Sequence, residues 1–155
     1  MVDPSSLETE PPEETGLGAR LRAMMSDLLT SPKTRKRRQQ AAFHLRVAQG
    51  LKPAAMSGSP DDWHAYYDEL GRAILADEEH FTAYWLRCHA PIHFFESLRP
   101  DRRAAKTREI ARRWDADLRW LLTHFPDDAP AGTSLAEARE LRVQFERLCR
   151  GLERG

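Results

Sequence analysis

Apolar residues recur at intervals of three and four along most of this 155-residue chain, and no stretch shows sustained alternation of apolar and polar residues. Intervals of three and four return side chains to one face of an α-helix, whereas alternation is typical of a strand. The clearest segment lies near the C-terminus, where Leu135, Ala138, Leu141, Phe145 and Leu148 share a face. We therefore predict an all-α fold, a compact bundle of five or six helices.

Prolines, glycines and small polar residues predict where these helices begin and end. The expected helices are residues 16–30, 32–49, 60–75, a fourth starting near 77, 100–124, and a last one after residue 134. Ser59 is expected to cap the third helix, with Pro60 in its first position. Ser134 and Glu137 form the S-x-x-E pattern of a capping box. Gly50 is expected to stop the second helix and to leave a loop before Ser59.

The N-terminal end of the chain differs in composition from the rest. Residues 1–15 contain five acidic residues and three prolines but no basic residue, a composition typical of disordered segments. The acids are Asp3, Glu8, Glu10, Glu13 and Glu14. We interpret residues 1–15 as a disordered acidic tail and residues 16–155 as a single helical domain of ordinary size.

The sequence offers no signal for membrane insertion or for secretion. No apolar run approaches the roughly 20 residues that span a bilayer. The acidic N-terminal residues are unlike the basic and then apolar start of a secretory signal. Cys88 and Cys149 lack a zinc-type spacing and are expected to be reduced, partly buried core residues. We therefore expect a cytoplasmic protein with no membrane role.

Positive charge is concentrated at the start of two predicted helices, where helix electrostatics favour acids. The formal net charge of the chain is zero, so an electrostatic function requires such local segregation. Residues 31–52 contain no acid, and the second helix begins with what we call the first basic cluster: Lys33, Arg35, Lys36, Arg37 and Arg38. Each cation at the positive end of a helix forgoes about 0.3–1 kcal/mol relative to a favourable placement. The predicted fifth helix begins with the second basic cluster: Arg99, Arg102, Arg103 and Lys106.

These clusters predict a site for a negatively charged partner. Free backbone N–H groups and the helix dipole favour phosphate at a helix N-terminus, and flanking cations strengthen that preference. Several such contacts along a nucleic-acid backbone would give affinity that is independent of base sequence and sensitive to salt. We predict that the two clusters, together with Arg46 on the outward face of the second helix, bind the backbone of RNA or DNA or another polyanion.

This pattern favours a non-enzymatic accessory subunit or adaptor within a larger complex. Two alternatives stay open: the clusters could dock an acidic surface of a protein partner, which would make the chain a purely protein-binding helical module, or they could form a solvated surface with no partner. The sequence contains no zinc-finger, basic-zipper or RNP-type aromatic motif, so reading of base sequence is not expected.

Motifs for catalysis, cofactors and metals are sparse. The chain has no Walker A loop and no GxGxxG, GxSxG or HExxH motif, so no cofactor is expected. His89 and His93 are four residues apart, which would place two imidazoles on one helical face with Glu96 nearby. Pro91 lies between them and is expected to kink or break the fourth helix, which disrupts that geometry. We predict no metal site.

Arg87 and His93 form an Arg-x5-His spacing on one helical segment. This spacing resembles the motif of HEPN-type ribonucleases, in which an Arg and a His from paired helices polarise a scissile phosphate. The resemblance covers these two residues and implies a ribonuclease that uses them. It is the alternative, enzymatic prediction, because a His that acts as acid or base needs little more than a suitable position and pKa.

Most aromatic side chains follow the apolar stripes and are predicted to lie in the core. Phe43 is assigned to the apolar face of the second helix, together with Ala41. Tyr67, Phe94 and Trp120 fall off the strongest stripes, which makes them candidates for exposed stacking or docking residues.

Overall fold

The computed structural model describes residues 18, 20–22, 24, 25, 31–150 and 152. Contacts within the chain divide it into two units, Met1–Lys36 and Arg37–Gly155. The predicted acidic tail, residues 1–15, lies outside the described residues, as does much of the predicted first helix, residues 16–30. In the described part of that helix, Leu21, Met24 and Met25 are exposed.

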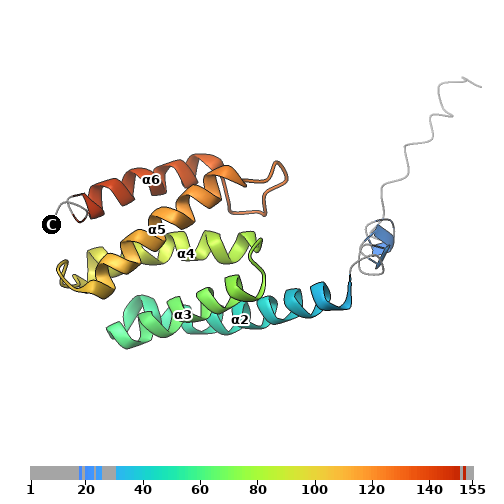
Figure 1. Cartoon of the computed structure of the whole chain (residues 1–155), viewed down its shortest axis with the longest axis horizontal. Helices are drawn as coiled ribbons and strands as arrows, with labels where there is room; N and C mark the ends of the chain where they lie inside the picture. The colour runs from blue at the N-terminus through green and yellow to red at the C-terminus, as the bar shows by residue number, and fades with distance from the viewer. Residues whose placement is uncertain (1–17, 19, 23, 26–30, 151, 153–155) are drawn as a thin grey trace, which may run out of the picture. The chain divides into compact units, whose positions relative to one another are not determined.

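Five α-helices and one π-helical segment lie within residues 32–149, and this described range contains no strand (Figure 1). In chain order they are α2 (Pro32–Ser57), α3 (Pro60–Ala76), α4 (Phe81–His93), the π-helix η2 (Phe94–Leu98), α5 (Ala105–Thr123) and α6 (Leu135–Cys149). The predicted all-α fold is confirmed. Within the part of the chain that the structure covers, no helix combines the length and the apolar character needed to cross a bilayer.

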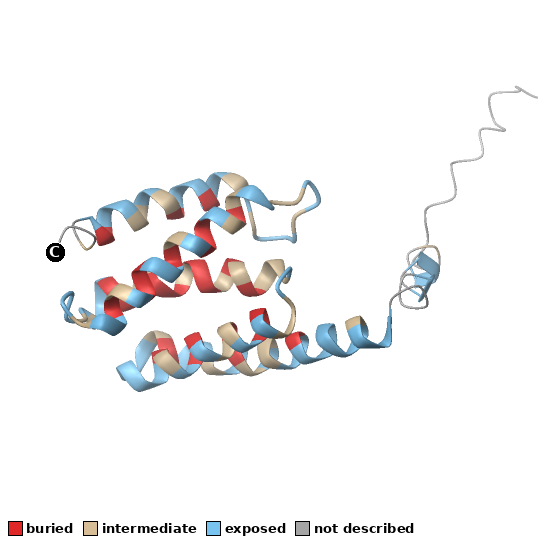
Figure 2. Ribbon diagram, viewed as in Figure 1, coloured by how far each residue is buried: buried red, intermediate tan, exposed pale blue. Residues whose placement is uncertain are grey.

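Helix α4 occupies the centre of the second unit. It packs against α3, α5, α6 and η2, and α5 in turn lies beside α6 (Figure 1). Buried positions follow these contacts, and Figure 2 shows them on the facing sides of α3, α4 and α5. The core is therefore shared by α4 and the two longer helices that pack against it.

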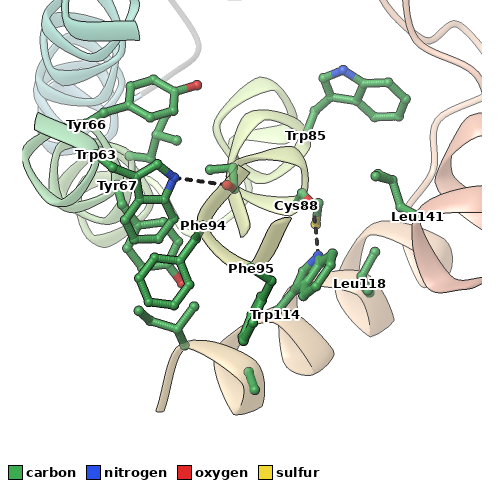
Figure 3. Close-up of a cluster of buried hydrophobic side chains, with 14 of the residues drawn as sticks. Trp63, Tyr66, Tyr67, Trp85, Cys88, Phe94, Phe95, Trp114, Leu118 and Leu141 are labelled. Carbon is green, nitrogen blue, oxygen red and sulfur yellow. Dashed lines mark hydrogen bonds between the residues drawn. The ribbon is translucent and has the colours of Figure 1, made fainter. Parts of the chain in front are cut away.

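The centre of the core is aromatic (Figure 3). Trp63 of α3 stacks on Phe94, with ring centroids 4.5 Å apart. The indole N–H of Trp63 donates to the Ala90 carbonyl at 3.0 Å, and that of Trp114 on α5 donates to the Cys88 carbonyl at 2.8 Å. A buried donor left without an acceptor is costly, so these two bonds favour one placement of α3 and α5 against the backbone of α4.

Two predicted helix starts are confirmed by their cap hydrogen bonds. The Ser59 hydroxyl accepts from the Asp62 backbone N–H at 3.4 Å, and the Ser59 N–H donates to the Asp62 carboxylate at 3.2 Å, so α3 begins with a capping box. The Ser134 hydroxyl accepts from the Glu137 N–H at 3.1 Å at the start of α6. Both caps join atoms no more than three residues apart, so they can be predicted from the sequence.

Helix α2 is longer than predicted because it does not stop at Gly50. It continues through Gly50 and Pro53 to Ser57, so the predicted end at residue 49 is wrong. Pro53 removes one backbone donor from the helix. The added turns bury Ala55 and pack Met56 against the core, and this tertiary contact outweighs the local stop signals.

Helix α2 also presents a different face to the core than predicted. It buries Ala41, Ala48 and Ala55 completely, and these three alanines are seven residues apart. A seven-residue interval keeps one narrow seam facing a neighbouring helix. Phe43 lies about 200° around the helix from Ala41 and is 55% exposed, so its assignment to the core face is wrong.

The fourth helix begins later than predicted and is not broken by its proline. Asp77 accepts from the Glu79 N–H at 3.1 Å in a turn, and α4 begins at Phe81 rather than near residue 77. The helix continues through buried Pro91 and passes into η2, where the Phe94 N–H donates to the carbonyls of Ala90 and Pro91. The predicted break at Pro91 is therefore wrong: α4 continues to His93, and the helix then changes to π-helical geometry.

Candidate polyanion-binding surface

The first basic cluster lies in the opening turns of α2. The helix begins at Pro32, and the Ser31 hydroxyl accepts from the Thr34 N–H at 3.2 Å, so one of the free N–H groups at this end is already capped. The first turn contains no acid. Lys33, Arg35 and Lys36 belong to the first unit, whereas Arg37 and Arg38 belong to the second. All five side chains are exposed.

The two basic clusters and Arg46 form no ion pair with a carboxylate of a described residue. None of these ten side chains makes an ion pair or a side-chain hydrogen bond to another residue that the structure describes. The other described arginines are of both kinds. Those paired with Asp or Glu are Arg72, Arg87, Arg113, Arg119, Arg142 and Arg147. Arg112, Arg139 and Arg150 are exposed and form no such pair. The first basic cluster is distinguished by its density along the chain, with five unpaired cations within residues 33–38.

The second basic cluster lies mostly in the connection before α5. This helix begins at Ala105, so the predicted start at residue 100 is wrong. Asp101 accepts from the Arg103 N–H at 2.9 Å in a turn, and Arg99 ends η2 with a positive φ of 47°. Ala104 offers no side-chain cap, and the first turn of α5 contains no acid. All four cations are exposed, and three of them precede the helix instead of lying on it.

The charge of Lys106 reaches α3. Burial and the positive charge of Lys106 lower the pKa of His64, while the carboxylates of Asp61 and Asp68 act in the opposite direction. Lys106 and the two acids of α3 therefore act on the same imidazole, that of His64.

Arg87 and His93, the pair that resembles the HEPN motif, have different surroundings. Arg87 is buried between α4 and α5, where Nε donates to Asp117 Oδ2 and Nη2 donates to Asp117 Oδ1, both at 2.7 Å. Burial is the largest single influence and lowers the pKa of Arg87, but the hydrogen bonds and the negative charge of Asp117 act together with smaller contributions from Tyr67 and Tyr84, so the pKa is raised. The His93 Nε2 atom is buried and has no hydrogen-bond partner in the described structure. The Nε and Nη2 donors of Arg87 are thus occupied by Asp117.

Of the two histidines considered for metal binding, His89 is engaged locally. His89 Nδ1 lies 2.7 Å from the Trp85 carbonyl oxygen, and His89 Nε2 lies 3.3 Å from a carboxylate oxygen of Glu137. Over the residues placed in the structure, no three His, Cys, Asp or Glu side chains come together as a set of metal ligands.

The aromatic candidates for exposed stacking are placed differently from the prediction. Tyr67 and Phe94 are buried in the core, so their assignment to the surface is wrong. Trp120 is partly buried and stacks on Tyr84, with ring centroids 3.8 Å apart. The exposed ring is that of Phe43, which sequence periodicity missed because the alanine seam, and not the larger side chains, faces the core.

Comparison with protein-family models, with curated proteins and with solved structures finds no match for this chain.

Proposed function

We propose that the protein is a non-enzymatic accessory subunit or adaptor that binds a nucleic-acid backbone, or another polyanion, through the basic start of α2. The observation that carries this proposal is the set of exposed cations with no carboxylate partner among the described residues. Arg46 and the second basic cluster would add contacts. The sequence contains no zinc-finger, basic-zipper or RNP-type motif that would read base edges. The affinity would therefore come mainly from phosphate contacts and would not depend on base sequence.

The acid-free composition of α2 supports this reading. All 26 residues of the helix, from Pro32 to Ser57, lack Asp and Glu. A chain with zero net charge would repel a polyanion from its acidic surfaces, so such a long segment without acids gives the partner one region to approach. Arginine suits this task because its planar guanidinium contacts phosphate oxygens in pairs.

A cytoplasmic location and assembly with protein partners are part of the same proposal. The buried Cys88 is a free thiol, the state that a reducing compartment maintains. An acidic protein surface is the competing partner for the basic clusters. It is an outcome that the following experiment can reveal.

The test is fluorescence anisotropy of labelled, mixed-sequence RNA and DNA with the full chain at several salt concentrations. Four phosphate contacts on a single strand predict a log–log salt slope of about −3, which weakens binding roughly fiftyfold between 50 and 200 mM salt. Replacing Arg35, Lys36, Arg37 and Arg38 with Ala should remove most of the affinity and flatten the slope.

The matched control removes the same charge elsewhere. Arg72, Arg113, Arg119 and Arg147 are exposed but paired with carboxylates, so their replacement by Ala should leave the affinity largely unchanged. Equal affinity of the wild type and the first variant would overturn the proposal. A pull-down from the native host that recovers a stoichiometric acidic protein without any nucleic acid would favour the protein-binding alternative instead.

A further inference from the structure

Phe43 is an aromatic ring on the solvent face of α2. Large hydrophobic residues that are exposed in the described structure are Leu21, Met24, Met25, Phe43, Leu75 and Val143, and Phe43 is the aromatic one among them. Its ring contact in the described structure is T-shaped, with the neighbouring His44, centroids 5.4 Å apart and an interplanar angle of 71°. The Phe43 ring therefore makes no face-to-face stack with another described ring.

The exposed neighbours of Phe43 on the helix are polar, and one of them is a cation. Residues three and four positions away are its neighbours on the helix surface. They are the exposed Gln39, Gln40 and Arg46, and the partly buried Val47. Helix α2 supplies no acid, and the nearest carboxylate tied to it, that of Glu69, lies on the inner side, where it binds His44. Phe43 and Arg46 therefore present a ring beside an unpaired cation.

The charge of the outer face of α2 indicates which kind of partner could bind beside Phe43. An exposed apolar patch among acids would suit a basic partner, but here the surface of α2 is positive and contains amide side chains. Single-stranded nucleic acid combines a negative backbone with unpaired bases that stack on aromatic rings. A duplex offers the same phosphates but keeps its base faces inside the stack.

We propose that the outer face of α2 binds single-stranded nucleic acid by stacking an unpaired base on Phe43, with Arg46 contacting an adjacent phosphate. This inference rests on the proposed polyanion binding and narrows it to single strands. It also differs from a mode based on a helix N-terminus, because Phe43 and Arg46 lie in the middle of α2.

The test compares three probes with the full chain by fluorescence anisotropy: a mixed-sequence single strand, the same sequence as a duplex, and heparin, which has charge but no bases. Phe43→Ala should weaken binding to the single strand roughly 5- to 150-fold, the range for loss of one stacked base, and change duplex and heparin binding less than about twofold. Phe43→Trp should retain single-strand affinity. Circular dichroism checks that the exposed substitution leaves the fold intact.

Val143→Ala is the matched control, since Val143 is 56% exposed but lies on α6, and it should change no affinity. Unchanged single-strand affinity in Phe43→Ala, or preference of the wild type for the duplex, would overturn this inference while leaving polyanion binding intact. Failure of the wild type to bind any of the three probes would overturn the proposed function and this inference together.

Discussion

Arg87 illustrates how differently the arginines of this chain are used. Its side chain is almost wholly buried, lies 5.7 Å from the centre of the Tyr84 ring, and meets Asp117 through two hydrogen bonds. Burial raises the pKa of Asp117, and the Arg87 guanidinium opposes that rise. A complete buried ion pair adds little net stability, but a buried charge that has lost its partner is strongly destabilising. The pair therefore ties α4 to α5 in one arrangement.

Removing one partner of this pair should be far worse than removing both. We expect Asp117→Ala to lower the free energy of unfolding by about 3–5 kcal/mol, because Arg87 stays buried without a counter-charge. The double variant Arg87→Met, Asp117→Leu should recover most of that loss. Urea denaturation measures both. As a control, Arg119→Ala, which breaks an exposed pair with Asp115, should cost less than about 1 kcal/mol. A single variant as stable as the double one would contradict the structural role.

At the scale of the elements, α2 is held to α3 by small contacts and one polar bridge. The alanine seam buries little apolar area per residue, since each side chain is a single methyl group. The carboxylate of Glu69 on α3 accepts a hydrogen bond from His44 of α2, with Oε2 2.8 Å from Nδ1, and forms an ion pair with Arg72. Burial raises the pKa of Glu69, but the hydrogen bonds from His44 and Arg72 outweigh it, so the pKa in the folded protein is below its ordinary value.

This shift makes the attachment of α2 sensitive to acid. An acid whose pKa is depressed by folding contributes stability above its ordinary pKa, here 4.5, and that contribution is lost as the pH falls through the lower folded-state value. The difference in unfolding free energy between wild type and Glu69→Gln should therefore be larger at about pH 6 than at about pH 3. Urea titrations at both values check this. Glu140→Gln, an exposed change on α6, should show no such difference, and a constant gap for Glu69→Gln would refute the expectation.

At the scale of the whole molecule, stability is unevenly distributed. Helix α4 packs against three α-helices and η2. The buried indole N–H groups of Trp63 and Trp114 each donate a hydrogen bond to a backbone carbonyl of α4. Helix α2 contributes only three fully buried alanines and is exposed over most of its length (Figure 2). The proposed binding surface therefore lies on the helix with the least support from the core.

Amide hydrogen exchange should reveal this gradient. Opening of a weakly packed element costs less free energy than opening of the core, so we expect amides in the middle of α2 to exchange at least about tenfold faster than those of α4, after correction for intrinsic rates. Addition of a single-stranded oligonucleotide should slow exchange in α2 selectively. Equal protection of α2 and α4 in the free protein would contradict the uneven distribution.

Much of the fold was predictable because helix periodicity and capping are local. Ser59 and Ser134 cap helices through atoms within three residues, and the apolar spacing alone indicates helices without strands. Boundaries failed where a distant contact competed with a local signal. Gly50 lies inside α2 because the later turns of that helix pack against the core. Pro91 lies inside α4, which continues to His93 and is followed by a π-helical segment.

The sequence by itself determined the helical class and the place of the first basic cluster at the start of a helix, since both follow from residue type and spacing. Only the tertiary structure decided which cations have partners and which aromatic rings are exposed. Arg87 meets Asp117 from a helix thirty residues away in the chain, whereas Arg46 meets no carboxylate that the structure describes. Phe43 faces solvent, and Tyr67 does not, because a helix orients by the face that packs most closely, and here that face is a seam of alanines.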